Sequence, residues 1–300
     1  MDVIPLEGSL HAHAFQGMTF PSYSPALSAA CAGDPRALAI GAFDEADAPL
    51  GLLIAGREGP RAEILSLFTR ADRRRKGVAK ALLAAAEKRL AADGVSTVEA
   101  SIERGRPFRD AAESLLASAG YGPFKRSSFM MRCLGPSKVR SAPWVRRLTI
   151  PAAFEAFPWT ELKPAERETI IERQRKEHWI PDNLYPFVEE QWLEPANSLG
   201  LRYGGEVIGW QVNHRLIPHT VRYTYTFVRA DLQPSGVALA LLAESVRRHV
   251  DTPLIDEAPN ATFKVPAEFE GMTRFVDKHW RGTADEVNEV VKGSKNLARS

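Results

Sequence analysis

Two segments of this chain of 300 residues repeat one another, and this repeat limits the fold more than any other feature. The first reads RKGVAKALLAAAEKRL and begins at Arg75, and the second reads PSGVALALLAESVRRH and begins at Pro234. They start about 159 residues apart, and each follows a strand-like run and opens a helix rich in alanine and leucine. A repeat at this distance indicates a tandem duplication of one domain rather than a short-period solenoid.

The apolar pattern of the first half predicts a mixed αβ domain. Short apolar runs indicate strands, and apolar residues at helical spacing indicate helices. The expected order is β-β-β-α-β-α-β, at residues 38–42, 50–55, 61–69, 78–91, 95–102, 109–119 and 127–134. Gly135 to Lys138, followed by Pro143, predicts a linker. We therefore expect an α/β (α+β) chain of two domains, 1–135 and 136–300, each a mixed, mostly antiparallel sheet flanked by helices.

The second half is expected to follow the same plan. Its helices and strands are predicted at residues 163–178 and 237–250, and at residues 146–150, 199–203, 206–213 and 220–228. Tyr223 and Tyr225 are expected on one face of the last of these strands. The aromatic residues of segment 178–192 either pack the core or line a pocket for an organic cation. Segment 283–300 is polar and charged at its end, and we expect it to fray.

Composition excludes several classes of protein. The chain is 44% hydrophobic and 25% charged, which is ordinary for a soluble globular protein. Its net charge of +2 is too small to indicate a nucleic-acid partner, and no apolar stretch is long enough for a membrane span. No secretory signal is expected, and Cys31 and Cys133 are interpreted as reduced packing thiols, which favours the cytoplasm. No metal is expected, because His11 and His13 have no evident third ligand.

The segment around Gly77 predicts an anion site. The N–H groups at the start of a helix are unpaired, and the helix dipole favours negative charge there. Gly77 allows a ligand to approach the backbone, Ala79 keeps the helix start clear, and the basic run 74–76 adds charge. The expected ligand is a pyrophosphate, although the GxxxxGK[ST] and GxGxxG motifs are both missing.

The same segment resembles the signature of the GNAT superfamily of acyl-CoA-dependent N-acyltransferases. Arg74 to Ala79 fits the pattern (Arg/Gln)-x-x-Gly-x-(Gly/Ala), and Gln233 to Ala238 fits it again. Ala112 and Gly120-Tyr121 are similar to the ending of that fold, in which a helix leads to glycine and an aromatic residue. The resemblance covers both halves and implies a tandem GNAT protein that uses acetyl-CoA or another acyl-CoA as co-substrate. Residues 1–35, however, match the first strand and two helices of the family poorly.

The resemblance also implies which residues bind the coenzyme. The turn amides would hold the pyrophosphate, and the preceding strand would pair with the pantetheine arm. The residues expected in these roles are Leu67, Phe68, Thr69, Arg74, Arg75, Lys76, Gly77, Val78, Ala79 and Lys80, with Gln233, Gly236 and Ala238 in the second half.

Glu63 corresponds to the general-base glutamate of the histone-type members, although a surface carboxylate would look the same in the sequence. The equivalent position of the second half is Arg222, which cannot act as a base, so we expect catalysis in the first half. The second half would then bind the acceptor or serve as scaffold, unless the roles are reversed. Two family positions differ: Leu116 replaces the tyrosine that protonates the thiolate, and Arg109 replaces an asparagine.

The sequence therefore predicts an N-acetyltransferase that moves an acetyl group from acetyl-CoA to a primary amine of a small molecule or peptide. One alternative is a non-catalytic coenzyme A-binding or interaction protein. Another is a tandem aminoacyl transferase that uses charged tRNA, but this would require an extended basic surface. Neither the acceptor nor the oligomeric state follows from the sequence.

Overall fold

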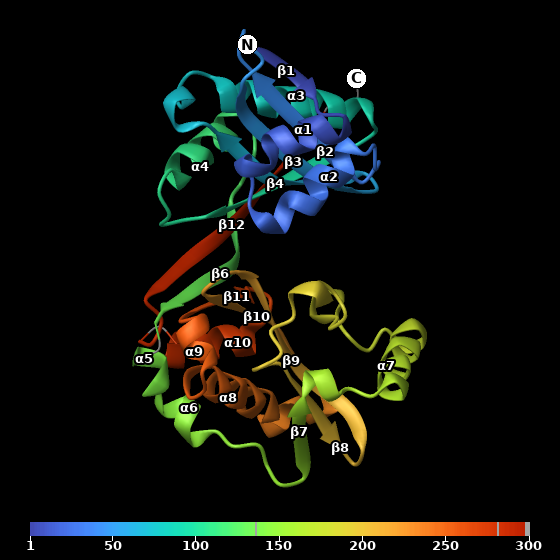
Figure 1. Ribbon diagram of the computed structural model, residues 1–300, viewed down its shortest axis with the longest axis vertical. Helices are drawn as coiled ribbons and strands as arrows, with labels where there is room; N and C mark the ends of the chain where they lie inside the picture. The colour runs from blue at the N-terminus through green and yellow to red at the C-terminus, as the bar shows by residue number, and fades with distance from the viewer. Residues whose placement is uncertain (136, 281, 298–300) are drawn as a thin grey trace. The chain divides into compact units, whose positions relative to one another are not determined.

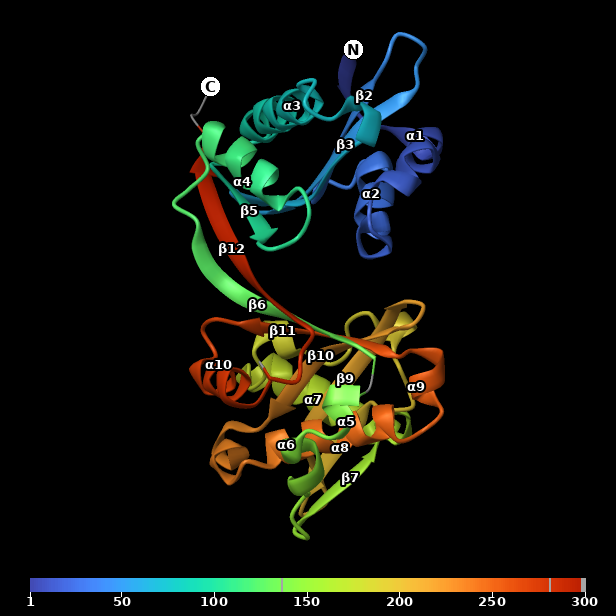
Figure 2. The ribbon, with the colours of Figure 1, turned by 90° about the vertical axis from the view of Figure 1, so that its left-hand side faces the viewer.

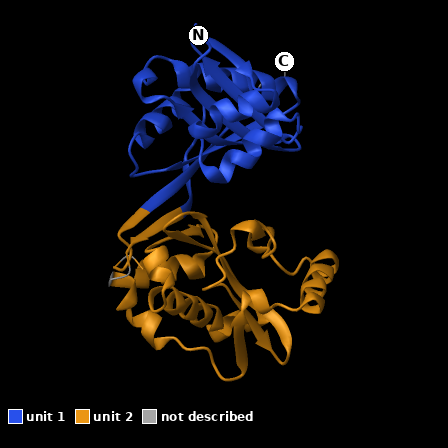
Figure 3. Cartoon of the chain, viewed as in Figure 1, with its two compact units in different colours: residues 1–128, 288–300 blue, residues 129–287 orange. Residues whose placement is uncertain are grey.

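The chain forms two compact units. A computed structural model describes residues 1–135, 137–280 and 282–297 (Figure 1). Unit 1 comprises residues 1–128 and the segment from Asn288 onward, and unit 2 comprises residues 129–287 (Figure 3). The division falls inside two strands, β6 (Lys125–Leu134) and β12 (Glu286–Asn296), so each of these strands contributes residues to both units.

Unit 1 is a twisted sheet with helices on both faces (Figure 2). The strand order is β1-β2-β3-β4-β5-β12-β6. The remaining strands are β1 (Asp2–Pro5), β2 (Ala37–Phe43), β3 (Pro49–Glu58), β4 (Arg61–Thr69) and β5 (Thr97–Glu103). The pairs β1–β2, β2–β3, β3–β4 and β5–β12 are antiparallel, whereas β4 and β5 run parallel.

Two apolar clusters hold the helices of unit 1 on its sheet. On one face, α3 (Val78–Ala92) and α4 (Arg109–Ser118) bury residues such as Leu82 and Leu116 against the strands. On the other face, α1 (Gly8–Phe15) and α2 (Ser24–Cys31) bury Phe15 and Leu27. Each helix therefore covers the sheet through one apolar stripe, as expected for amphipathic helices.

Unit 2 repeats this arrangement with more helices. Its strand order from β6 is β6-β11-β10-β9-β8-β7. The strands are β7 (Phe154–Pro158), β8 (Leu199–Tyr203), β9 (Glu206–Ile217), β10 (Thr220–Val228) and β11 (Asn260–Pro266). The helices are α5 (Ser137–Arg140), α6 (Pro143–Arg147), α7 (Pro164–Glu177), α8 (Val237–Val250), α9 (Leu254–Glu257) and α10 (Glu270–Phe275). Helix α8 packs in two apolar clusters on one side of the sheet, and α7 packs in a third cluster rich in aromatic rings.

The two units share one backbone plan. In unit 1, β4 pairs in parallel with β5 and antiparallel with β3. In unit 2, β10 pairs in parallel with β11 and antiparallel with β9. Helices α3 and α8 each begin directly after a glycine in the left-handed region, Gly77 and Gly236. The fold expected from the repeat, two mixed αβ units, is confirmed. The strands and helices predicted between residues 38 and 134 all exist, with ends shifted by a few residues.

Three predictions about local structure were wrong. Residues 146–150 are not the first strand of the second half, because Pro143 starts helix α6 and the strand begins only at Phe154. Segment 283–300 does not fray where it is described, because β12 pairs with β5 from Val290 to Asn296, and residues 298–300 lie outside the described part. Residues 1–35 do contain a strand and two helices. These elements are short, so their sequence pattern is weak.

A β-bulge corrects the prediction for two tyrosines. The register between β9 and β10 shifts between Tyr223 and Tyr225, so Thr224 is an extra residue in β10. Tyr223 consequently packs in the cluster beneath α8, whereas Tyr225 packs in the aromatic cluster beside α7. The two rings do not share a face.

The boundary of the units also differs from the expected one at residue 135. The last strand, β12, supplies the sheet of unit 1 from Asn288 onward, although it follows all of unit 2 in the sequence. Its Val291 is only 1% exposed and belongs to the core of unit 1. The C-terminal segment is therefore part of the first compact unit.

Candidate functional site

Strands β4 and β5 of unit 1 pair over only part of their length. Their parallel register runs from Arg61 opposite Thr97 to Ile64 opposite Ala100, and β4 then continues to Thr69 without a partner on that side. A register shift against β3 places a bulge at Leu65, where the pairing with β5 ends. The backbone of residues 66–69 is therefore available on this side to an extended ligand. Leu67, Phe68 and Thr69, expected to pair with a pantetheine arm, lie in this segment.

The turn after β4 presents unpaired backbone donors. Arg75 (φ +64°) and Gly77 (φ +84°) both adopt left-handed conformations, which direct the chain sharply into helix α3. No hydrogen bond within the described chain is formed by the N–H groups of residues 75–80. A Cβ added at Gly77 would meet no atom within 4 Å, so the surface above this glycine is open. These donors and the helix dipole could hold an anion.

The basic side chains of the turn are mostly not neutralised. Arg75, Lys76 and Lys80 are exposed and form no ion pair with a described residue. Arg74 donates a hydrogen bond from Nε to the Thr69 carbonyl (3.4 Å) and places its Cζ 4.2 Å from the centroid of the Phe108 ring. The structure thus brings together all the turn residues that the sequence predicted, from Arg74 to Lys80, at the open end of β4.

Glu63 lies on β4, one residue before the end of the paired segment. Its side chain is 42% exposed. Its Oε1 accepts a hydrogen bond from the Ser101 hydroxyl (3.2 Å) and lies 3.5 Å from the Lys292 Nζ of β12. Lys292 also donates to Glu99 (3.0 Å). Although burial opposes it, the hydrogen bond to Glu99 and the charge of Glu63 raise the pKa of Lys292.

Neither Leu116 nor Tyr121 can supply the proton of a general acid. Leu116 is 5% exposed and Tyr121 is 4% exposed, and both belong to the apolar core of unit 1. Burial, with a contribution from Glu87, raises the pKa of Tyr121 far above its usual range. Arg109, at the position of the family asparagine, begins helix α4. A general acid in unit 1 would have to be a different residue or a solvent molecule.

In the corresponding turn of unit 2, several N–H groups are already hydrogen-bonded within the chain. Gln233 donates from Nε2 to the Val228 carbonyl (2.9 Å), which reproduces the contact of Arg74 with Thr69. The turn itself is a 3-10 helix over Ala230–Ser235, in which Gly236 N–H donates to the Gln233 carbonyl (3.1 Å). Pro234 has no N–H, and Val237 N–H donates to the Ser235 hydroxyl. Fewer donors remain at Gly236 and Ala238 than in unit 1.

The face of unit 2 that corresponds to Glu63 is covered by segment 178–192. Arg222 forms an ion pair with Glu189, and the Trp210 indole donates to the Leu184 carbonyl (3.1 Å). Trp179 contacts the rings of Trp210 and Phe227. Trp179, Tyr185 and Phe187 of this segment therefore pack against the sheet, which is the first of the two expectations.

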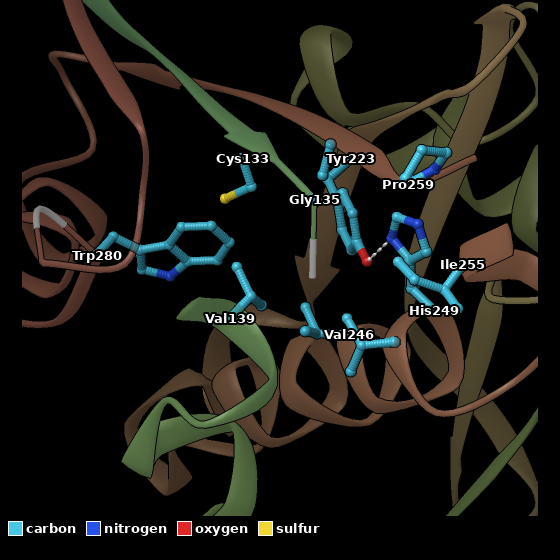
Figure 4. Close-up of a pocket in the computed structure, with 11 residues that line it drawn as sticks. Cys133, Gly135, Val139, Tyr223, Val246, His249, Ile255, Pro259 and Trp280 are labelled. Carbon is cyan, nitrogen blue, oxygen red and sulfur yellow. Dashed lines mark hydrogen bonds between the residues drawn. The ribbon is translucent and has the colours of Figure 1, made fainter. Parts of the chain in front are cut away.

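Unit 2 also contains a small cavity beneath helix α8 (Figure 4). Figure 4 shows Cys133, Trp280 and the hydrogen-bonded pair Tyr223 and His249 (3.0 Å) around it. Burial raises the pKa of Cys133 to about 12 and lowers the pKa of His249, so both stay uncharged near neutral pH. The cavity reaches the later turns of α8 rather than its first turn, so it is separate from the turn at Gly236.

Two general features of the described residues bear on function. No group of three or more His, Cys, Asp or Glu residues among them has the arrangement of a metal site. In the same residues, every helix is too short or too polar to cross a membrane. Cys31 and Cys133 are free and buried.

Comparison with known proteins shows which family model unit 1 matches and which fold the chain has. Residues 9–121 match the model of the Acetyltransferase (GNAT) family. A tandem GNAT protein from the clavulanic acid biosynthesis pathway, solved without AcCoA, superposes over 100% of this chain and 99% of its own, with TM-score 0.69 and 12% identity. The chain is a tandem GNAT-fold protein.

Two further solved structures share the fold over nearly all of this chain. A GCN5-related N-acetyltransferase from Sphaerobacter thermophilus covers 98% of this chain and 96% of its own, with TM-score 0.61 and 13% identity. A GCN5-related glucosamine N-acetyltransferase region of a fungal multi-domain GH3 β-N-acetylglucosaminidase covers 98% of this chain and 38% of its own, with TM-score 0.64 and 10% identity. No curated protein sequence matches the chain.

Sequence reasoning missed three residues that the structure places at the site. Lys292 and Ser101 contact Glu63 from β12 and β5, and Phe108 contacts Arg74 from the loop before α4. The pairing of β12 with β5 spans about 190 residues of sequence, so no local pattern signals it. Phe108 gives a weak signal, because it is an aromatic residue in a basic loop of the first domain.

Proposed function

We propose that unit 1 is the catalytic unit of an N-acetyltransferase, which uses acetyl-CoA and a primary amine on a small molecule or peptide. The observation that carries this proposal is the unpaired N–H groups of residues 75–80, beside a strand end whose backbone has no partner. Together they fit an acyl-CoA, which has a pyrophosphate and an amide-containing arm. Unit 2 lacks the open turn and the carboxylate, and it would serve as scaffold or bind the acceptor.

The proposed reaction requires only one residue of the protein to act as a base. The amine nitrogen attacks the thioester carbonyl carbon, the C–N bond forms, and the C–S bond breaks to release the coenzyme thiolate. Glu63 would accept the proton that the amine loses, directly or through water, and Ser101 and Lys292 would hold its carboxylate in place. Because Leu116 and Tyr121 are buried in the core, we assign protonation of the thiolate to solvent.

Calorimetric titration with acetyl-CoA tests the location of the site. In Gly77→Glu, a carboxylate would occupy the anion site, so we expect the affinity to fall at least 100-fold, about 2.7 kcal/mol. Gly236→Glu is the matched control, because Gly236 has the same backbone conformation and open space above it. It should bind like the wild type. Loss of binding only in Gly236→Glu would move the site to unit 2.

Transfer of acetyl groups to a panel of primary amines tests the assignment of the base. Glu63→Gln should lower kcat about 100-fold or more, within the range for general base catalysis, while acetyl-CoA affinity stays unchanged. Glu99→Gln is the matched control, since it also contacts Lys292 but lies on β5. Equal rates for Glu63→Gln and the wild type would show that Glu63 is not the base.

A coenzyme-binding protein without activity is the second candidate, and the buried Leu116 at the position of the family acid favours it. Acetyl-CoA binding with no transfer to any amine in the panel would support that candidate. Binding that depends on Gly77 together with transfer that depends on Glu63 would exclude it.

A further inference from the structure

Phe108 is exposed beside the open turn of unit 1. Its side chain is 68% exposed, which is unusual for a phenylalanine in a folded unit. Its backbone adopts φ +65°, a left-handed conformation that is rare for aromatic residues, at the position before helix α4. The ring is therefore presented to solvent at a defined place rather than buried.

A planar cation covers one side of this ring. The Arg74 guanidinium lies 4.2 Å from the ring centroid and is also tied to the end of β4 through Thr69. Arginine and phenylalanine both stack on flat aromatic groups. The pair thus forms a stacking surface next to the N–H groups that we assign to the pyrophosphate.

The residues adjacent in sequence to this pair carry positive charge without a partner. Arg75 and Lys76 follow Arg74, and Arg109 follows Phe108, and none of the three forms an ion pair with a described residue. An additional phosphate near the ring would find several cations there. A ligand with one flat ring and more than one phosphate fits this surface best.

We propose that Phe108 and Arg74 bind the adenine ring of coenzyme A, and that Arg109 contributes to binding its 3′-phosphate. This inference rests on the proposed function. Adenine is the sole aromatic group of the coenzyme, because the pantetheine arm consists of amides and alkyl chains. Phe108 would therefore act on the nucleotide part of the ligand and leave the arm unaffected.

Unit 2 has the opposite charges at the same place. Phe269 precedes helix α10 as Phe108 precedes α4, but Glu268 and Glu270 flank it. Gln233 stands where unit 1 has Arg74. Two carboxylates would repel a phosphate, so the nucleotide site belongs to unit 1 alone.

Calorimetry with two ligands separates the parts of the coenzyme. We expect Phe108→Ala to weaken coenzyme A binding about tenfold, which corresponds to 1.4 kcal/mol, and to leave 4′-phosphopantetheine binding unchanged. Phe108→Trp should restore the affinity. Phe20→Ala is the control for loss of an exposed ring, since Phe20 is 59% exposed on the segment between α1 and α2. For Arg109→Ala, the preference for coenzyme A over dephospho-coenzyme A should shrink.

Three results would overturn this proposal. Unchanged coenzyme A affinity in Phe108→Ala would show that the ring does not contact the ligand. Equal losses for coenzyme A and 4′-phosphopantetheine would place the ring on the arm or show a distorted turn. In both cases wild-type binding persists, so the proposed function stands. A wild-type protein that binds neither ligand would overturn the proposed function as well.

Discussion

The turns at Gly77 and Gly236 follow the same backbone path but differ in how many N–H groups they leave free for a ligand. In both, the first motif residue bonds back to the carbonyl at the end of the preceding strand, Arg74 to Thr69 and Gln233 to Val228. In the first turn a 3-10 helix ends at Arg73 and the N–H groups of residues 75–80 stay unpaired, whereas in the second the 3-10 helix continues to Ser235. The comparison teaches that the motif fixes the path of the chain, and that the residues between its fixed positions decide whether donors remain for a ligand.

The cores beneath the two turns differ in polarity. Where unit 1 has Leu53 and Ala86 in its apolar cluster, the corresponding positions of unit 2 have Gln211 and Ser245, which are fully buried. Asn213 donates to Ser245 (2.9 Å) and accepts from Gln211 (2.7 Å). Such a network stabilises only while every member is paired. Unit 2 should therefore be more sensitive to loss of a buried hydrogen-bond partner, and unit 1 to loss of an apolar contact.

The largest expected effect is on the shared strand β12. Val291→Asp would place an unpaired carboxylate in the core of unit 1, at a cost of more than about 3 kcal/mol. Hydrogen exchange should then lose protection in β5, while β10 stays protected. Val221→Asp in β10 is the matched variant, because Val221 is also fully buried, and it should affect unit 2 instead. Equal protection of β5 in Val291→Asp and the wild type would show that β12 contributes little to unit 1.

The next effect concerns acid and unit 2. Burial, with a smaller contribution from the charge of Arg222, lowers the pKa of His214 from about 6.5 to about 4. The unfolded chain therefore binds a proton before the folded chain does as the pH falls. The contribution of the neutral His214 to the free energy of unfolding is therefore fully present above pH 6.5. It decreases between pH 6.5 and 4, by up to about 3 kcal/mol.

Tryptophan fluorescence can follow this transition separately, because all six tryptophans of the chain lie between residues 144 and 280, in unit 2. Urea midpoints at several pH values should fall with acid in the wild type and fall less steeply in His214→Gln. If both proteins show the same slope between pH 6.5 and 4, the buried imidazole is not the cause.

The smallest effect is expected at two equivalent glycines, where a substitution should destabilise both units to a similar extent. A Cβ at Gly51 would lie 2.7 Å from the Phe68 carbonyl oxygen, and one at Gly209 would lie 2.6 Å from the Phe227 carbonyl oxygen. Gly51→Ala and Gly209→Ala should each destabilise their own unit by roughly 1–3 kcal/mol. Hydrogen exchange of β3 and β9 measures each unit by itself. A loss in only one variant would show that the backbone plans are less alike than the contacts indicate.

Much of the fold could be predicted from the sequence, because its signals are local. The helix after Gly77 and the strand 61–69 follow from residues within one element. The position of β12 could not be predicted, since its sequence is polar and its partner β5 is distant. Helix α6 was missed because the β-branched and apolar residues after Pro143 also suit a strand. At the site, the turn residues and Glu63 were accessible to sequence reasoning, whereas Lys292 required the topology.

The position of β12 has a consequence for the order in which the protein is made. Residues 288–296 leave the ribosome after the roughly 160 residues of unit 2, which takes on the order of 8–30 seconds at typical rates of synthesis. Throughout that time β5 has an unpaired edge, which is a template for aggregation. A nascent chain of this protein therefore cannot complete its first domain until it has made its second, and a prematurely terminated product would carry an open sheet edge that chaperones can recognise.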